Sequence, residues 1–458
     1  MQKQREHWSS HLGFILAAAG SAVGLGTLWQ VPYTTGKNGG GAFVLVYILC
    51  ILLVGIPVFV SELILGRKAQ KGAVATFDVL TPEKPFWKLG GWLGVITSFV
   101  IVSYYSVIAG FGLNYTLMSL NQFYIGKTPA EISAVYDTLT HSGDIVIFFH
   151  LLFTALTVGV VYLGIKQGIE FWSKFMMSGL FVMLIGLTLY SVTLPGFGKA
   201  VHFLFYPDWA NFKPASALEA LGLAFFTLSV GQGIMITYGS YMRKSEDIPR
   251  TGGIIGFTIV AVAALAGLMI FPIIFTYGYE PSQGPGLVFK TLPVLLAQLP
   301  GALILSTMFF LLFVFAALTS SIAMVEVLVS TLMDLKGWER HKSVIIVGIT
   351  CFLFGIPSAL SDTPFLFGNW KTIYGINFFE TMNQLVSNWL LPLGGLLIAI
   401  YVGWILDKEV SKEEFQSGST LKYLLKLWFF FIKYIAPLAI LLIMLQNAGI
   451  IDINKWTR

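Results

Sequence analysis

Apolar residues dominate this chain in long blocks, and short polar segments separate one block from the next. We count eleven such blocks, centred near residues 24, 53, 105, 155, 182, 230, 265, 318, 350, 393 and 436. An α-helix needs roughly 20 mostly apolar residues to cross the hydrocarbon core of a bilayer. The pattern therefore predicts an all-α polytopic membrane protein with eleven transmembrane helices. Because the intervening segments are short, we expect residues 1–458 to form a single transmembrane domain.

Two of the blocks are interrupted by paired glycines near their middle. Residues 12–35 carry no charge and contain Gly24 and Gly26, and residues 221–241 contain Gly231 and Gly233. Glycine weakens a helix, and unwound backbone at mid-membrane is tolerated only where it lines a cavity or is buried in protein. For one block alone, close helix packing is the better explanation. Paired interruptions in the two halves of a chain favour a small-molecule site of the kind that transporters have.

Composition and charge exclude several other classes of protein. The chain is 56% hydrophobic and 11% charged, which no soluble domain matches. It has no HExxH, GxSxG or Walker motif and no histidine cluster with metal spacing, so we do not expect an enzyme. Cys50 and Cys351 both lie in apolar blocks and are expected to be buried thiols. The net charge of +5 requires no nucleic acid; the expected partners are a small molecule and the lipid bilayer.

Most lysine and arginine residues fall on one side of the predicted spans. Arg67, Lys68, Arg243 and Lys244 are examples from the segments on that side. Cytoplasmic segments are enriched in these residues. We therefore expect the N-terminus in the cytoplasm and, with eleven spans, the C-terminus outside.

Several motifs resemble those of the neurotransmitter:sodium symporter family, in particular its bacterial amino-acid transporters. They are Arg5-Glu6-His7-Trp8, Gly20 to Gly26, Asn38 to Phe43, Gly55-Ile56-Pro57, Phe225 to Gly231 and Ala316 to Ser321. The resemblance implies the LeuT-type fold in the cytoplasmic (inner) membrane of a bacterium. Two inverted repeats would comprise helices 1–5, about residues 10–195, and helices 6–10, about residues 215–408. Helices 1 and 6 would be broken at mid-membrane, and helix 11 would follow at about residues 420–450.

The resemblance implies a complete second sodium site. Its ligands would be the backbone carbonyls of Gly20, Val23 and Ala316 and the hydroxyls of Thr319 and Ser320. The alternative is that both hydroxyls only bond to carbonyls one turn earlier in their own helix. The match in helix 1 favours sodium.

The first sodium site of the family is incomplete in this chain. The matching positions are Ala22, Thr27, Thr227 and Ile259, and the family has asparagine where Thr27 and Ile259 stand. A one-residue error in register would bring Thr258 to this place and restore one oxygen. We expect one sodium ion, with two as the alternative, and no organic cofactor.

The substrate site implied by the resemblance is mostly apolar. Its residues would be Ser21, Ala22, Gly24, Leu25, Gly26, Ile101, Tyr105, Ile108, Phe226, Thr227, Ser229, Gln232, Ser320 and Met324. Amine-transporting members have an aspartate at the position of Gly24, so glycine leaves room for a substrate with its own carboxylate, which Tyr105 would bind. Gln232 departs from the apolar or aromatic residue usual in the family. It would either bind a polar group of the substrate or bond the unwound helix-6 backbone.

The family also has two gates. The outer gate would consist of Gln30, Tyr105, Phe226 and Asn383, with amides in place of the usual arginine and aspartate and with Glu380 as an alternative partner. The inner gate would consist of Arg5, Trp8, Tyr241 and Asp334. Glu62 and Glu326 are acids in or near spans and are candidates for function. Glu62 would accept hydrogen bonds from freed helix-6 amides; the alternative is that either acid is a satisfied residue at the edge of a span.

Together these features predict a sodium-coupled symporter that imports a neutral, hydrophobic amino acid by alternating access. The first alternative is a transporter or exchanger driven by one sodium ion or by protons. The second is a membrane sensor that binds an amino acid without transporting it.

Overall fold

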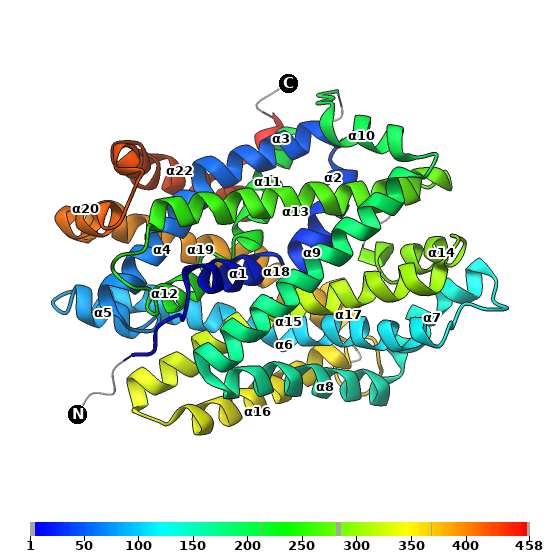
Figure 1. Ribbon diagram of the computed structural model, residues 1–458, viewed down its shortest axis with the longest axis horizontal. Helices are drawn as coiled ribbons and strands as arrows, with labels where there is room; N and C mark the ends of the chain where they lie inside the picture. Colours follow the sequence, from blue (N-terminus) through cyan, green and yellow to red (C-terminus); the bar gives the residue numbers. More distant parts are fainter. Residues whose placement is uncertain (1–4, 211, 281–284, 368, 456–458) are drawn as a thin grey trace.

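The computed structural model describes residues 5–210, 212–280, 285–367 and 369–455, and regular structure within these ranges is helical. The helices run side by side as one bundle (Figure 1). The short helices α5 (Ala75–Leu80) and α20 (Lys408–Gln416) lie at the end of the bundle where the chain begins. The short helices α7 (Pro129–His141) and α14 (Thr291–Ala297) lie at the opposite end.

Nine helical stretches in the described residues are long and apolar enough to cross a membrane. Four of them are single helices: α8 (Gly143–Tyr162), α13 (Ile248–Thr276), α15 (Ala302–Lys336) and α16 (Arg340–Ala359). Two consist mainly of one helix: Pro85–Leu120 contains α6 (Lys88–Leu120), and Ile165–Val192 contains α9 (Phe171–Val192). Three contain two helices each: Gly41–Ala69 has α3 (Gly41–Cys50) and α4 (Ile56–Ala69), Phe378–Ile405 has α18 (Phe378–Leu385) and α19 (Leu391–Ile400), and Lys422–Asn447 has α21 (Leu425–Phe430) and α22 (Ala436–Asn447). The short helices α10 (Phe197–Phe205) and α17 (Trp370–Tyr374) connect some of them.

A tenth span results when a bent pair of helices is counted as one. The pair is α1 (His11–Ala22) and the stretch Gly26–Lys37, which ends in α2 (Val31–Lys37), and the two parts meet at 52°. The predicted block near residue 230 corresponds to two shorter helices, α11 (Pro214–Thr227) and α12 (Ile234–Gly239). Neither is long enough to span by itself, so the count of eleven stays a prediction.

The break between α11 and α12 has the backbone that its sequence predicts. Gly231 and Gly233 have φ of 80° and 73°, a region that glycine enters without steric cost. Ser229 adopts φ of 55° without being a glycine, which is uncommon and marks a constrained segment. A Cβ on Gly231 would lie 2.6 Å from the carbonyl oxygen of Leu391. The break is therefore packed directly against α19.

The break in the first span lies at the centre of the bundle. The side chain of Ser10 caps the start of α1 by accepting a hydrogen bond from Gly13 N, and α1 ends where Val23 N bonds to the carbonyl of Ala19. α1 packs against α9, α13 and α15, and lies among them in the middle of Figure 1. The last carbonyls of α1 have no partner inside the helix, so they are available to whatever lies at the break.

Candidate functional site

A cavity of about 310 Å³ lies where the two breaks meet α6 and α15. It is lined by Ser21, Ala22, Gly24, Leu25, Gly26, Ile101, Tyr105, Phe226, Ser229, Gln232, Ile234, Ser320 and Met324.

All but two of the predicted substrate residues line this cavity. Ile108 is buried elsewhere in the core. Thr227 donates a hydrogen bond from its hydroxyl to the carbonyl of Leu223 (2.9 Å) within α11. Sequence reasoning missed Ile234, which lines the cavity as the first residue of α12. Its position directly after Gly233 is the signal that could have identified it.

Hydrogen bonds join the two breaks across the cavity. The hydroxyls of Ser229 and Ser320 both donate to the carbonyl of Ser21, at 2.8 and 2.9 Å. The amide of Leu25 donates to the hydroxyl of Tyr105 (3.1 Å). That hydroxyl acts as an acceptor in this bond and also contacts the hydroxyl of Ser320.

Glycine is required at the first break because other groups approach it closely. A Cβ on Gly24 would lie 2.4 Å from Ser320 Oγ and 2.9 Å from the Tyr105 hydroxyl. A Cβ on Gly26 would lie 2.5 Å from the ring of Phe226. The wall of the cavity on this side is therefore bare backbone.

The residues of the predicted second sodium site lie together where α1 meets α15. A Cβ on Gly20 would lie 3.1 Å from Thr319 Cβ, and Ser320 Oγ is 3.4 Å from the carbonyl of Gly20. Thr319 Oγ1 donates to the carbonyls of Phe315 (3.1 Å) and Ala316 (3.0 Å), which is the bond to the preceding turn considered above. The hydroxyl lone pairs remain available. Uncharged oxygens of this kind fit a weakly bound monovalent cation.

The predicted first sodium site has fewer oxygens. Thr27 Oγ1 donates to the carbonyl of Ala22 (3.1 Å). Ile259 is fully buried and has no donor atom to offer. Thr258 bonds to the carbonyl of Ile254 (2.8 Å) in its own helix. The hydroxyl of Tyr47, which sequence reasoning missed, lies 2.8 Å from Thr227 Oγ1.

The residues of the predicted outer gate are only partly brought together. Tyr105 and Phe226 both line the cavity. Asn383 accepts a hydrogen bond from the hydroxyl of Tyr104 (3.3 Å), whereas Gln30 is half-buried and has no hydrogen bond to another described residue. The amide pair between Gln30 and Asn383 is therefore not formed in this structure.

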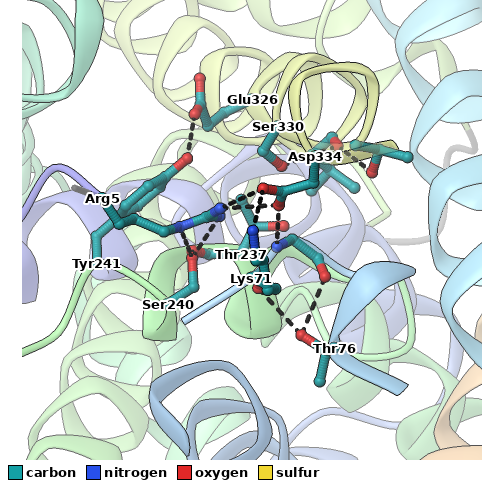
Figure 2. A network of polar contacts seen from close by, with 12 residues as sticks. Arg5, Lys71, Thr76, Thr237, Ser240, Tyr241, Glu326, Ser330 and Asp334 are labelled. Carbon is teal, nitrogen blue, oxygen red and sulfur yellow. Dashed lines mark hydrogen bonds and ion pairs between the residues drawn. The ribbon is translucent and has the colours of Figure 1, made fainter. Parts of the chain in front are cut away.

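The residues of the predicted inner gate lie together, and Figure 2 shows three of them, Arg5, Tyr241 and Asp334. Arg5 binds the carboxylate of Asp334 through one nitrogen, at 2.8 and 3.0 Å, and lies 4.8 Å above the ring of Tyr241. Trp8 is buried and donates from its indole nitrogen to the carbonyl of Tyr238 (3.1 Å). Burial alone would lower the pKa of Arg5, but the nearby Tyr241 and Asp334 raise it. Arg5 therefore stays charged.

Figure 2 also shows partners that sequence reasoning missed. Ser240 accepts from Arg5 at 2.7 Å, and the amide of Gly72 donates to Asp334 (2.6 Å). Glu326 is fully buried, accepts from the Tyr241 hydroxyl (2.6 Å), and is paired with Arg340 at 2.8 Å. The sequence predicted only that Arg340 contributes to the positive charge on one side of the spans. It gave no sign that Arg340 pairs with Glu326 in the preceding helix.

Glu62 lies beneath the second break. It is fully buried, and its Oε1 accepts a hydrogen bond from the amide of Gly231 (2.6 Å). This is the contact predicted from the sequence. It satisfies an amide that the unwound segment would otherwise leave unpaired.

Comparisons with known proteins agree with this architecture. A family model described as "Sodium:neurotransmitter symporter family" matches residues 5–125 and 120–457. The chain is 39% identical to the uncharacterized sodium-dependent transporter YhdH of Bacillus subtilis, over 97% of this chain and 98% of that protein. It is 36% identical to an uncharacterized sodium-dependent transporter of Haemophilus influenzae, with the same coverage. The crystal structure of MhsT in complex with L-phenylalanine is similar, with a TM-score of 0.89, 41% identity, and coverage of 97% of this chain and 100% of that one.

Proposed function

This chain belongs to the sodium:neurotransmitter symporter family, a family of multi-pass membrane transporters, and from that premise we propose that it imports a neutral amino acid together with sodium. The observation that carries the proposal is the cavity between two broken helices, lined by bare backbone on one side and apolar side chains on the other. The names of the relatives support sodium dependence, and the amino acid bound to MhsT supports the substrate class.

The two ends of the amino acid would bind at the first break. The helical stretch that begins at Gly26 has the positive end of its dipole there, which favours a carboxylate. The Tyr105 hydroxyl would turn its proton toward the same group. Carbonyls at the end of α1, including that of Ala22, would accept from the amine. The apolar residues Ile101 and Met324 would surround the side chain.

Sodium would bind at the second site as a transported ion. Its ligands would be the carbonyls of Gly20, Val23 and Ala316 and the hydroxyls of Thr319 and Ser320. Since Ile259 removes a ligand from the first site, we propose that one ion is transported with each amino acid. Binding of the ion to one state of the transporter more tightly than to the other would couple the gradient to import.

Alternating access would require the inner gate to open. Helices 1–5, about residues 10–195, and helices 6–10, about residues 215–408, would form the inverted repeats, and helix 11 would occupy about residues 420–450. The N-terminus would lie in the cytoplasm and the C-terminus outside, across the inner membrane of a bacterium. Release of Arg5 from Asp334 would free the start of α1 to move away from α12.

Uptake into proteoliposomes under imposed gradients tests the proposal. Radiolabelled neutral amino acids should accumulate when sodium is higher outside, and liposomes without the protein supply the background. Accumulation under a proton gradient without sodium would favour the alternative driven by protons, which the incomplete first site keeps open. Binding without accumulation under any gradient would favour an amino-acid sensor.

A further inference from the structure

Gln232 lines the cavity, and its side-chain oxygen has no hydrogen-bond partner in the part of the chain that the structure describes. The residue is 3% exposed. Its backbone carbonyl accepts from the hydroxyl of Ser98 (2.8 Å). The unwound backbone here is therefore bound by Ser98, and the amide side chain of Gln232 is not used for that purpose.

The other polar side chains of the cavity wall already have partners. Ser229 and Ser320 donate to the carbonyl of Ser21, and Ser21 donates to the carbonyl of Ala18 (2.8 Å). Tyr105 accepts from Leu25 and would donate to the carboxylate of the substrate. Gln232 thus contributes an acceptor oxygen that neither the wall nor the two charged ends of an amino acid would satisfy.

The position of Gln232 is fixed by the packing of its neighbours. A Cβ on Gly94 would lie 2.9 Å from the amide nitrogen of Gly233, so α6 presses directly against the break at this point. Because the backbone beside Gln232 is held, its side chain enters the cavity from a defined point of the wall. The amide can still rotate about its side-chain bonds, so a bound ligand rather than the wall would fix its orientation.

We propose that Gln232 selects, among neutral amino acids, those whose side chain carries a hydrogen-bond donor on an otherwise apolar frame. Tyrosine and threonine hydroxyls and the indole N–H of tryptophan are donors of this class. This inference rests on the proposed function, because it takes the cavity as an amino-acid site. A side chain without a donor would displace water and leave the buried oxygen unpaired, which costs more than an average hydrogen bond gains.

Matched pairs of ligands that differ in one donor group test the inference. The pairs are tyrosine with phenylalanine, tryptophan with its benzothiophene analogue, and threonine with valine. Affinities are measured by titration calorimetry on the purified full-length protein in sodium-containing buffer. For the pair whose frame fits best, we expect the donor-bearing member to bind about tenfold more tightly.

The variant Gln232→Met should reverse this preference. Methionine has a similar length and no strong acceptor, so the donor of the ligand would become the unpaired group while the analogue still binds. The matched control is Gln298→Met, the same exchange at a glutamine that does not line the cavity and whose side-chain amide bonds to the carbonyl of Val294 (3.2 Å); it should keep the preference. Gln232→Leu serves as a second variant if Gln232→Met binds neither member.

Each result has one meaning. If no amino acid binds to the wild-type protein, the proposed function fails. If the wild-type protein binds both members of every pair equally, or if the preference survives in Gln232→Met, the inference is overturned and the proposed function stands.

Discussion

The charge of Asp334 is expected to set the balance between the closed and open states of the inner gate. Its carboxylate binds Arg5 at 2.8 and 3.0 Å, the amide of Gly72 at 2.6 Å, and Lys71 at 3.5 Å. The side chains of Arg5 and Asp334 are 15% and 10% exposed. Asp334→Asn retains the shape and one acceptor oxygen but removes the charge that Arg5 binds.

The size of the effect follows from this geometry. Breaking a fully buried ion pair costs about 3–5 kcal/mol. The pair here retains some exposure, and Arg5 keeps its bonds to Ser240 and its contact with the ring of Tyr241. We therefore expect a loss of about 2 kcal/mol from the closed state, which is about a thirtyfold shift toward the open state.

Thiol labelling measures this shift. Thr237→Cys places a thiol of nearly the same size beside the gate, at a position that is fully buried and whose hydroxyl has no partner among the described residues. With Cys50 and Cys351 replaced by alanine, a membrane-impermeant reagent applied from the cytoplasmic side should label this cysteine about thirty times faster in Asp334→Asn.

A control variant tests whether the loss of any carboxylate on this side of the protein would also raise the labelling rate. Glu413→Gln removes the pair between Lys68 and Glu413, whose side chains are 30% and 65% exposed. Exposed pairs contribute little, so labelling should change by less than about twofold. A rate in Asp334→Asn that stays within the same twofold range would refute the assignment of this pair as the gate.

Three further predictions concern the ion and the substrate. The double variant Thr319→Ala and Ser320→Ala removes two of five sodium ligands, so sodium-dependent uptake should be lost while the protein still folds; unchanged sodium dependence would refute the site. In Gly24→Asp the new Cβ would lie 2.4 Å from the present position of Ser320 Oγ, and the carboxylate would stand beside the expected carboxylate of the substrate, so titration should detect no amino-acid binding; near-normal affinity would contradict an amino-acid substrate. Substrate binding as a function of sodium should give a Hill coefficient near one, and Thr27→Ala should reduce affinity little; a coefficient clearly above one would show a second ion.

The sequence predicted the broken helices well because their signal is local. The glycines near residues 24 and 231 interrupt apolar blocks, and they are where the first span bends and where backbone φ becomes positive. The contact between Glu62 and Gly231 also followed, since a buried acid near an unwound segment has few other partners. The role of each site residue came from the family resemblance, because composition and periodicity do not assign one.

Contacts between distant segments were less predictable. The ion pair of Glu326 and Arg340 forms only if α15 and α16 are rotated so that both side chains point toward each other. The packing of the bundle sets that rotation, and the sequence alone does not reveal it. Asn383 contacts Tyr104 rather than Gln30 because α18 lies beside α6. Thr227 was expected in the substrate cavity, but its hydroxyl turns back into α11 and toward Tyr47.

The division of the cavity into a backbone wall and a side-chain wall determines how its selectivity can be redesigned. A side chain at Gly24 or Gly26 would require Ser320, Tyr105 or Phe226 to shift, so the surface proposed to receive the ends common to all amino acids tolerates little variation. Ile101, Gln232 and Met324 form the opposite surface, where one residue can be exchanged for another of similar size. A combinatorial library confined to these three positions would sample new transported side chains while leaving the framework that recognises every amino acid intact.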